Sequence, residues 1–192
     1  MRFEDGTVMR LYPQTVQDFG LYAGLELSEG EMKKMRAAAG TMSAKMRAVR
    51  IVAASAVSKN DLEHRLIQKG ETAEDAKQAV KWMSDMDLVD DRKTAEQIVQ
   101  RCIRKGYGIS RAKQALFEKR IPKGFWDSAL ENYPSQMDAI VFFLKTKLKN
   151  SHDTREVRKV VDALMRRGHS YGEIRKGLEQ LSLDEDDFLE EF

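Results

Sequence analysis

The sequence predicts an all-α protein, built of tandem three-helix repeats in an elongated or crescent-shaped array and preceded by a small N-terminal β-hairpin. Three observations lead to this prediction. Apolar residues recur at helical spacing between residues that cap helices. The pattern repeats about every 50 residues. Short strand-forming stretches flank Asp5-Gly6, a turn signal, near the start of the chain.

The composition is that of a folded protein rather than a disordered one. Of 192 residues, 42% are hydrophobic and 33% charged, and only 3 are proline. Cys102 is the single cysteine, which excludes an intramolecular disulfide and a cysteine-based metal cluster. No apolar run approaches the roughly 20 residues of a membrane span, and the charged start is unlike a signal peptide. We therefore expect a cytoplasmic protein.

The first helical signal follows a hairpin and linker at residues 1–27. Ser28 and Glu31 have the spacing of a capping box, which predicts a leading helix over residues 28–44. Gly40 is expected to interrupt it, because glycine is a poor helix former.

Helix signals then continue in order along the chain. Ser58 is expected to begin a helix that ends at Gly70, and Thr72 is expected to cap the next one. An amphipathic helix follows, whose apolar face comprises Ala95, Ile98, Val99, Cys102 and Ile103. Gly106-Tyr107-Gly108 breaks this helix, and Ser110 is expected to cap the next one, which ends before Pro122.

The last three helices are expected near residues 136–148, 154–167 and 171–181, with Gly168 in the break between the second and the third. Ile140 and Leu144 are spaced to lie on one face of the first of them.

An internal repeat organises these helices. Leu66, Leu116 and Leu164 occupy one repeat position, and the helix-ending residues Gly70, Arg120 and Gly168 lie four residues later in each copy. We expect three-helix units at residues 45–90, 91–135 and 136–183, followed by an acidic tail at 184–192. Each unit is too small for a large core, so neighbouring units are expected to pack or abut.

Charge is unevenly distributed, although the whole chain carries only +2. Residues 91–123 hold ten Lys or Arg against three acids, whereas residues 184–192 hold six acids and no base. Such asymmetry favours a polyanion or an acidic protein surface as a partner for the middle of the chain. Solvation of helix faces explains the same residues about equally well. We also consider that the tail shields the basic region in the free protein.

A candidate binding surface lies around the Gly106–Gly108 turn. Helical geometry directs the basic residues of the two adjoining helices outward, and the turn brings the helices together. The expected surface consists of Arg101, Arg104, Lys105, Tyr107, Arg111 and Lys113. Guanidinium groups suit phosphate or carboxylate. Tyr107 either stacks on a base, fills a protein pocket or packs back onto its own unit.

Signals for catalysis are weak. His64, His152 and His169 are scattered, and surface or capping roles account for them better than metal binding. Cys102 falls on an apolar helix face, which favours a buried, inert thiol. The turn after Lys105 lacks the pattern of a phosphate-binding loop. We expect no catalytic residue, no metal site and no cofactor, and therefore no enzyme.

One stretch resembles a known family. The segment LVDDRKTAEQIVQRCIRKGYGISRAKQAL, from Leu88 to Leu116, is similar to the RecX regulatory proteins, and the weaker likeness extends from about Ala44 to Leu181. The resemblance implies an all-helical, non-enzymatic protein of tandem three-helix units. It also implies binding in the groove of the RecA filament on single-stranded DNA, with inhibition of the RecA ATPase and of strand exchange. DNA repair and the SOS response would be modulated accordingly.

Three hypotheses follow. The first is a monomeric modulator of the RecA filament that meets RecA, with or without contact to the single-stranded DNA within it, through the basic surface. The second is a direct DNA-binding protein that acts mainly through phosphate contacts, with binding that falls steeply as salt rises. The third is a helical scaffold for an unrelated protein.

Overall fold

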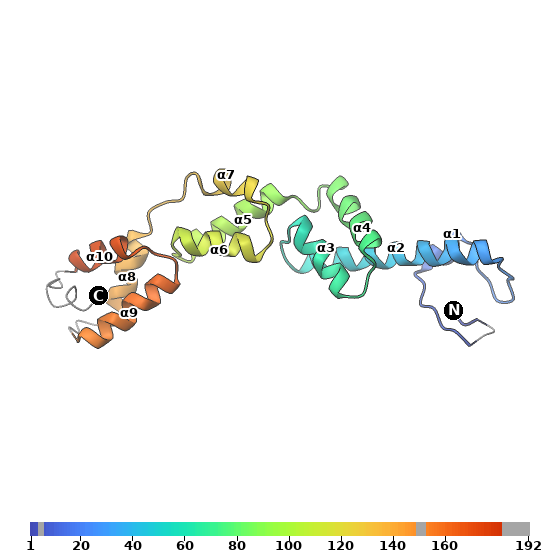
Figure 1. The fold of residues 1–192 in the computed structure, drawn as a ribbon, viewed down its shortest axis with the longest axis horizontal. Helices are drawn as coiled ribbons and strands as arrows, with labels where there is room; N and C mark the ends of the chain where they lie inside the picture. Colours follow the sequence, from blue (N-terminus) through green and yellow to red (C-terminus); the bar gives the residue numbers. More distant parts are fainter. Residues whose placement is uncertain (4–5, 149–152, 182–192) are drawn as a thin grey trace. The chain divides into compact units, whose positions relative to one another are not determined.

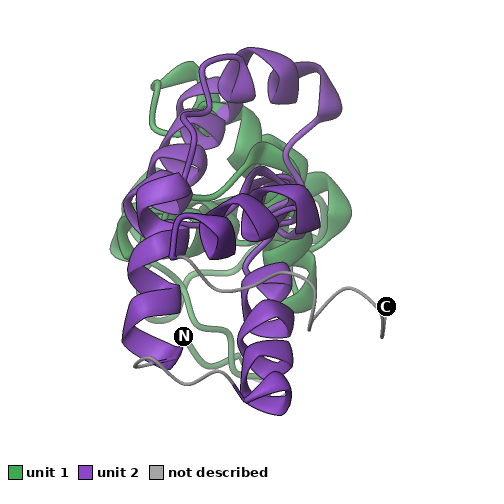
Figure 2. Ribbon diagram, turned by 90° about the vertical axis from the view of Figure 1, so that its left-hand side faces the viewer, with its two compact units in different colours: residues 1–90 green, residues 91–192 purple. Residues whose placement is uncertain are grey.

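The computed structural model describes residues 1–3, 6–148 and 153–181, and the described chain is helical (Figure 1). It divides into two compact units, Met1–Asp90 and Asp91–Phe192, here called the N-terminal and C-terminal units (Figure 2). The all-α prediction is confirmed. Each unit is described separately below.

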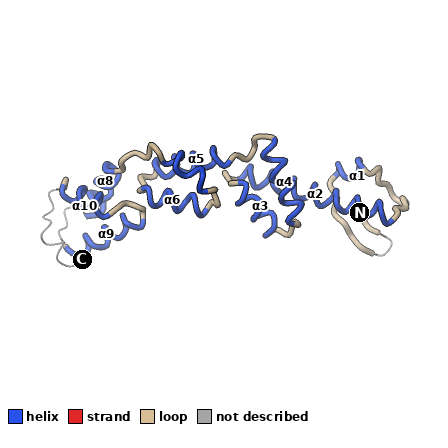
Figure 3. The backbone as a smooth tube through the Cα atoms, turned by 45° about the horizontal axis from the view of Figure 1, so that its top comes forward, coloured by secondary structure: helices blue, strands red, loops and turns tan. Residues whose placement is uncertain are grey.

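The predicted N-terminal β-hairpin is wrong. No strand occurs among the described residues (Figure 3), and the start of the chain contains only an isolated antiparallel bridge between Arg2 and Val8. The chain does turn back at Gly6, which has a φ of 82°. Asp5 of the predicted turn lies outside the described residues. Because the turn consumes most of this short segment, too few residues are left to form a stable pair of strands.

Four helices form the N-terminal unit. They are α1 (Pro13–Asp18), α2 (Glu29–Ala54), α3 (Lys59–Gln68) and α4 (Ala73–Asp85). Their N-caps follow the sequence signals closely. Ser28 forms the expected capping box with Glu31, and the side chains of Ser58 and Thr72 accept hydrogen bonds from backbone N–H groups three residues later.

The interruption predicted at Gly40 does not occur, because α2 runs through it. The leading helix and the helix expected to begin near Lys45 are therefore one element. A Cβ at Gly40 would lie 2.9 Å from the Asp75 carboxylate of α4, whose other oxygen accepts a hydrogen bond from Thr41 at 2.8 Å. The glycine thus serves a close approach between two helices and not a break.

The C-terminal unit holds α5 (Asp91–Arg104), α6 (Ile109–Glu118), the 3₁₀ turn η1 (Lys123–Phe125), α7 (Trp126–Leu130), α8 (Met137–Leu148), α9 (Thr154–Arg166) and α10 (Tyr171–Glu179). Two apolar clusters form its core. The first joins α5, α6 and α7 through residues such as Val99, Leu116 and Leu130. The second joins α8, α9 and α10 through residues such as Ile140, Leu164 and Ile174.

A single apolar cluster forms the core of the N-terminal unit, where α2, α3 and α4 meet around Ala48, Leu66 and Met83. We propose that the three clusters mark three repeats, with the boundaries expected from the sequence.

The same helix ending occurs at the aligned repeat position of each cluster. Gly70, Arg120 and Gly168 have positive φ values of 92°, 53° and 88°. In each case the following N–H donates to the carbonyl of the repeated leucine, at 3.1 Å for Leu66, 3.0 Å for Leu116 and 3.3 Å for Leu164. This is the Schellman pattern of a left-handed helix cap. The aligned positions of the repeat therefore share one backbone conformation.

Candidate functional site

The candidate surface begins at the end of α5. Ala95, Val99 and Cys102 are buried on one side of this helix, so Arg101 and Arg104 are exposed on the other. Lys105, which follows the helix directly, is exposed as well. Three cationic groups thus occur within five residues, at the C-terminal end of a helix, where the helix dipole favours positive charge.

Arg111 on α6 lies close to part of this cluster. Burial raises the pKa of the Cys102 thiol, while the charges of Arg111, Lys105 and Arg101 act in the opposite direction. All three cations are therefore near enough to act on this thiol, which is a buried free cysteine. Arg111 is itself half-buried and forms an ion pair with Glu118 at 2.9 Å, a hydrogen bond that raises the pKa of the guanidinium.

Lys113 does not share the face of Arg111. The two residues are separated by about 200° around the helix axis, and Lys113 is exposed. Arg104 lies on the same side of α5 as Arg101, because they are three residues apart. The structure thus groups Arg101, Lys105 and Arg111, leaving Lys113 at the flank.

Tyr107 packs back onto its own unit. The residue is half-buried against the α5–α7 cluster, and its backbone carbonyl accepts a hydrogen bond of 2.6 Å from the Tyr133 hydroxyl. Burial raises the pKa of Tyr133 to about 12, so this hydroxyl stays protonated near neutral pH. Lys105 Nζ lies 5.9 Å from the Tyr107 ring centroid. The Tyr107 ring therefore packs against its own unit and lies next to a lysine side chain.

Arg167 is a neighbour of this surface that sequence reasoning missed. Its guanidinium carbon lies 5.9 Å from the Tyr107 ring centroid and 4.4 Å from that of Phe143. Arginine between two rings is held by cation–π attraction and by stacking. In the sequence, Arg166 and Arg167 form a basic pair just before Gly168, at the expected end of a helix. No local pattern indicates that Arg167 lies beside Tyr107, which is sixty positions earlier.

A backbone joint connects the turn after α5 with the turn after α9. Gly108 N–H donates to the Arg167 carbonyl at 3.0 Å, and Ser110 N–H donates to the Gly168 carbonyl at 3.4 Å. The carbonyl end of α9 thus meets the amide end of α6, an arrangement that the two helix dipoles favour. We call Gly106, Gly108, Gly168 and His169 the glycine joint.

The prediction that Ser110 caps α6 is wrong. The N-cap is Gly108, whose missing side chain makes no capping hydrogen bond, and Ser110 is the second residue of the helix. A Cβ at Gly108 would overlap the Gly168 carbonyl, and one at Gly168 would overlap the Arg111 backbone. Glycine is required at both positions because another backbone occupies the space, and a carbonyl from α9 replaces the usual side-chain cap.

His169 completes the joint. The residue is 4% exposed, and its Nε2 donates to the Gly106 carbonyl at 3.1 Å. That hydrogen bond requires the Nε2 tautomer, and the buried Nδ1 has no hydrogen-bond partner within the described residues. Burial lowers the pKa of the imidazole, so the neutral ring is favoured. His169 thus has a structural role at the glycine joint.

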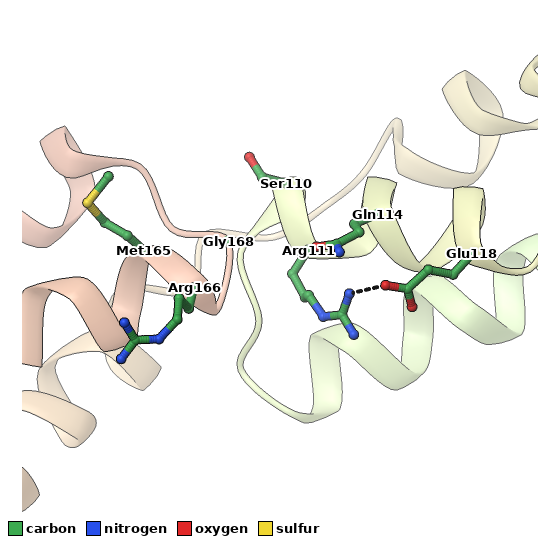
Figure 4. A pocket seen from close by; sticks show the side chains of 7 residues that line it. All are labelled: Ser110, Arg111, Gln114, Glu118, Met165, Arg166 and Gly168. Carbon is green, nitrogen blue, oxygen red and sulfur yellow. Dashed lines mark hydrogen bonds and ion pairs between the residues drawn. The ribbon is translucent and has the colours of Figure 1, made fainter.

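A shallow groove of about 460 Å³ lies beside the joint (Figure 4). Side chains of α6 form one wall, and the last residues of α9 form the other. The lining residues are Ser110, Arg111, Gln114, Glu118, Met165, Arg166 and Gly168. Such a groove offers arginine, an amide and a thioether, a set suited to an acidic peptide that also carries an apolar residue.

The described residues hold no group of three or more His, Cys, Asp or Glu side chains arranged for a metal ion. In the same part of the chain, no helix is both long and apolar enough to cross a membrane. The groups gathered at the candidate surface are cations and aromatic rings. Cations of this kind are suited to recognise negative charge.

Comparison with known proteins identifies relatives over most of the chain. No family model matches it. A protein of Vibrio campbellii named "Regulatory protein RecX" is 27% identical over 143 residues, which cover 73% of this chain and 92% of the relative. A protein of Vibrio parahaemolyticus with the same name is 26% identical over the same shares of both chains. Over most of its length this chain is similar to proteins named as RecX regulators.

Solved structures of RecX proteins share its fold. One crystal structure of regulatory protein RecX superimposes with a TM-score of 0.68 at 20% identity, covering 92% of each chain. The RecX of Lactobacillus salivarius gives a TM-score of 0.64 at 21% identity, covering 77% of this chain and 99% of that one. The likeness of the Leu88–Leu116 segment to RecX proteins is thus part of a relationship that extends over most of this chain.

Proposed function

We propose that this RecX-like chain binds the filament of the RecA recombinase and inhibits its ATPase and strand-exchange activities, thereby modulating recombinational DNA repair and the SOS response. It acts as a cytoplasmic monomer, without catalytic residues or a cofactor. The basic surface of the C-terminal unit meets acidic protein surface, or DNA backbone within the filament. Similarity to proteins named as RecX regulators supports the choice of partner.

The distribution of charge carries the proposal. Residues 91–181 contain 20 Lys and Arg against 11 Asp and Glu, a net charge of +9. Residues 1–90 contain 13 against 14, a net charge of −1. Residues 91–181 are therefore suited to attract a polyanion and residues 1–90 are not.

Within the C-terminal unit, the exposed Arg101, Arg104 and Lys105 supply the contacts. Planar guanidinium groups bind carboxylate or phosphate with two hydrogen bonds. Tyr107 contributes indirectly, since its half-buried ring lies beneath Lys105 and Arg167. Arg111 adds charge at the groove while paired with Glu118, and Lys113 extends the surface at its flank.

A direct DNA-binding function is the alternative that the same surface supports. Exposed arginine and lysine bind phosphates without regard to sequence, and each phosphate contact steepens the salt dependence of binding by about one unit of slope. The two functions differ in whether the contacts are made to naked DNA or only to the filament.

Hydrolysis of ATP by RecA on single-stranded DNA tests the proposal. This protein is titrated in below the concentration of DNA sites. We expect inhibition at substoichiometric amounts, because a filament regulator acts on many subunits at once. Inhibition only at saturation of the DNA would favour DNA masking, and no inhibition at any ratio would reject the proposal.

A matched pair of variants tests the surface. Arg101→Ala with Arg104→Ala removes two exposed cations from α5, and Lys33→Ala with Arg36→Ala removes two exposed cations from α2. We expect the α5 variant alone to weaken inhibition several-fold. Equal effects of the two variants would show that total charge matters and this surface does not. Loss of binding to naked DNA, with a salt slope lower by about two, would favour the DNA-binding alternative.

A further inference from the structure

One face of α6 carries two exposed apolar side chains. Ile109 is 40% exposed and Phe117 is 71% exposed. The exposed Lys113 lies midway between them, and residues four apart on a helix lie on one side, so the three form a stripe along α6. An adjoining face of the helix packs into the core through Ala112 and Leu116. Apolar residues of α6 thus extend beyond the face that the core covers. We call Ile109, Lys113 and Phe117 the α6 stripe.

The position of Phe117 is apolar and exposed in each of the three clusters. Phe117 directly follows the repeated leucine of its cluster, and Ile67 on α3 and Met165 on α9 do the same in the other two. Ile67 is 43% exposed and Met165 is 50% exposed. The helix cap does not account for them, because the apolar contact of a Schellman cap involves the leucine and not the residue after it. Single exposed apolar residues are ordinary, but recurrence at one repeat position indicates a contact with a partner.

The chemistry of these positions favours a protein partner over a nucleic acid. Bases stack on aromatic rings, whereas Ile109, Ile67 and Met165 offer no π-face. What these residues share with Phe117 is apolar bulk, which is stabilised when a pocket removes it from water. Phenylalanine and methionine are also enriched in protein–protein interfaces. The α6 stripe therefore fits an apolar pocket on the surface of a protein.

The charge around the stripe specifies the character of that protein. Residues 101–123 hold eight Lys or Arg against a single acid, Glu118, which is paired with Arg111. Lys113 adds an exposed cation between the two apolar side chains. A complementary surface carries carboxylates around its apolar pocket. The chain's own acidic residues 184–192 lie outside the described residues, so the occupant considered is a separate, acidic protein.

We propose that the α6 stripe is a protein-docking surface, in which Phe117 fills an apolar pocket of an acidic partner and Lys113 pairs with a carboxylate at the rim of that pocket. Phe117 is the anchor, because it is the larger and the more exposed of the two apolar residues. Ile109 extends the apolar contact by two helical turns. The inference rests on the proposed function, in which the acidic partner is the RecA filament.

Cosedimentation with RecA filaments tests the anchor. The filaments are assembled on single-stranded DNA with a non-hydrolysable ATP analogue, and binding to the same DNA without RecA is measured in parallel. We expect Phe117→Ala to weaken binding to the filament about tenfold, as for a central interface residue, and to leave binding to naked DNA unchanged. Phe142→Ala is the matched control, because Phe142 is 72% exposed on α8 of the same unit and lies outside the repeat position. Thermal unfolding checks that both variants fold.

Phe117→Leu separates an apolar anchor from a stacking ring. Leucine keeps apolar bulk, so this variant should retain most of the binding to the filament. Equal losses on naked DNA and on the filament, with Phe117→Leu no better than Phe117→Ala, would assign Phe117 to base stacking and overturn the proposal. Filament binding by Phe117→Ala equal to that of Phe142→Ala would also overturn it and would leave the proposed function standing. Failure of the unaltered protein to bind the filament would reject the proposed function and this inference together.

Discussion

The turn after α3 and the turn after α9 have the same local structure and different surroundings. Gly70 and Gly168 end their helices with nearly equal φ values and equivalent hydrogen bonds. Gly70 is exposed, with nothing within 4 Å of a Cβ, whereas Gly168 is buried against the backbone of Arg111. One repeated motif thus terminates a helix in the N-terminal unit and also builds a joint in the C-terminal unit.

The means of holding each turn differ accordingly. In the N-terminal unit, Arg47 of α2 donates to the Lys69 carbonyl at 2.8 Å and pairs with Glu71 at 2.7 Å. Side chains therefore hold the turn in the N-terminal unit. In the C-terminal unit, backbone groups of Gly108 and Ser110 bond directly to the turn. Backbone contact fixes the geometry more tightly, because it leaves no rotamers free.

Gly108→Ala should produce the largest effect. Gly108 has an ordinary φ of −72°, so the new methyl group causes no backbone strain of its own and acts only through its overlap with the Gly168 carbonyl. We expect a loss of about 3 kcal/mol in the free energy of unfolding, at the upper end for overpacking. Hydrogen exchange at Ser110 N–H should accelerate. The matched control is Gly172→Ala, which meets nothing within 4 Å, and equal stability of the two variants would contradict the joint.

The second largest effect should be a loss of stability at acidic pH, caused by protonation of His169 in the joint. Burial lowers the pKa of folded His169 below its ordinary value of 6.5. The unfolded chain therefore binds a proton first as pH falls, so stability is full above about pH 6.5 and is lost as pH falls toward the folded pKa. Denaturant unfolding between pH 7.5 and about 5 should show this slope. His169→Gln should flatten it while His64→Gln retains it, and an unchanged slope in the first variant would exclude His169 as the cause.

The smallest effects concern the helix endings outside the joint. Gly70→Ala adds a side chain in open space but in a left-handed conformation, which should cost about 1 kcal/mol. Arg120→Gly relieves a similar strain and should stabilise the protein by up to about 1 kcal/mol. Thermal unfolding measures both. The loss of stability in Gly168→Ala should exceed that in Gly70→Ala by the cost of breaking the joint. Equal losses would show that Gly168 acts only as an ordinary helix cap.

Most of the individual helices could be predicted from the sequence, because helix signals are local. Ser28, Ser58 and Thr72 cap helices through bonds to residues three positions away. Errors arose where a distant residue decided the outcome. Gly40 lies inside α2, where the absence of a side chain admits the Asp75 carboxylate of α4. Ser110 does not cap α6, and its N–H donates instead to the Gly168 carbonyl in the turn after α9.

The candidate surface divides in the same way. That Arg101, Arg104 and Lys105 are exposed follows from helical periodicity and from the buried Val99 and Cys102. The inward packing of Tyr107 was one of the possibilities that the sequence left open, and the Tyr133 hydroxyl, 26 positions away, settled it. The position of Arg167 could not be predicted for the same reason, because its two aromatic partners belong to other elements.

The sequence by itself determined the all-α class, the repeat and the concentration of positive charge in residues 91–123, because periodicity, capping and composition act over a few neighbouring residues. Tertiary structure alone decided that Gly108 meets the turn after α9, that His169 is buried at Gly106, and that Arg167 lies beside Tyr107. Those contacts join residues 60 or so positions apart. Their energy comes from backbone groups that are chemically alike at every position, so only the folded arrangement shows which of them touch.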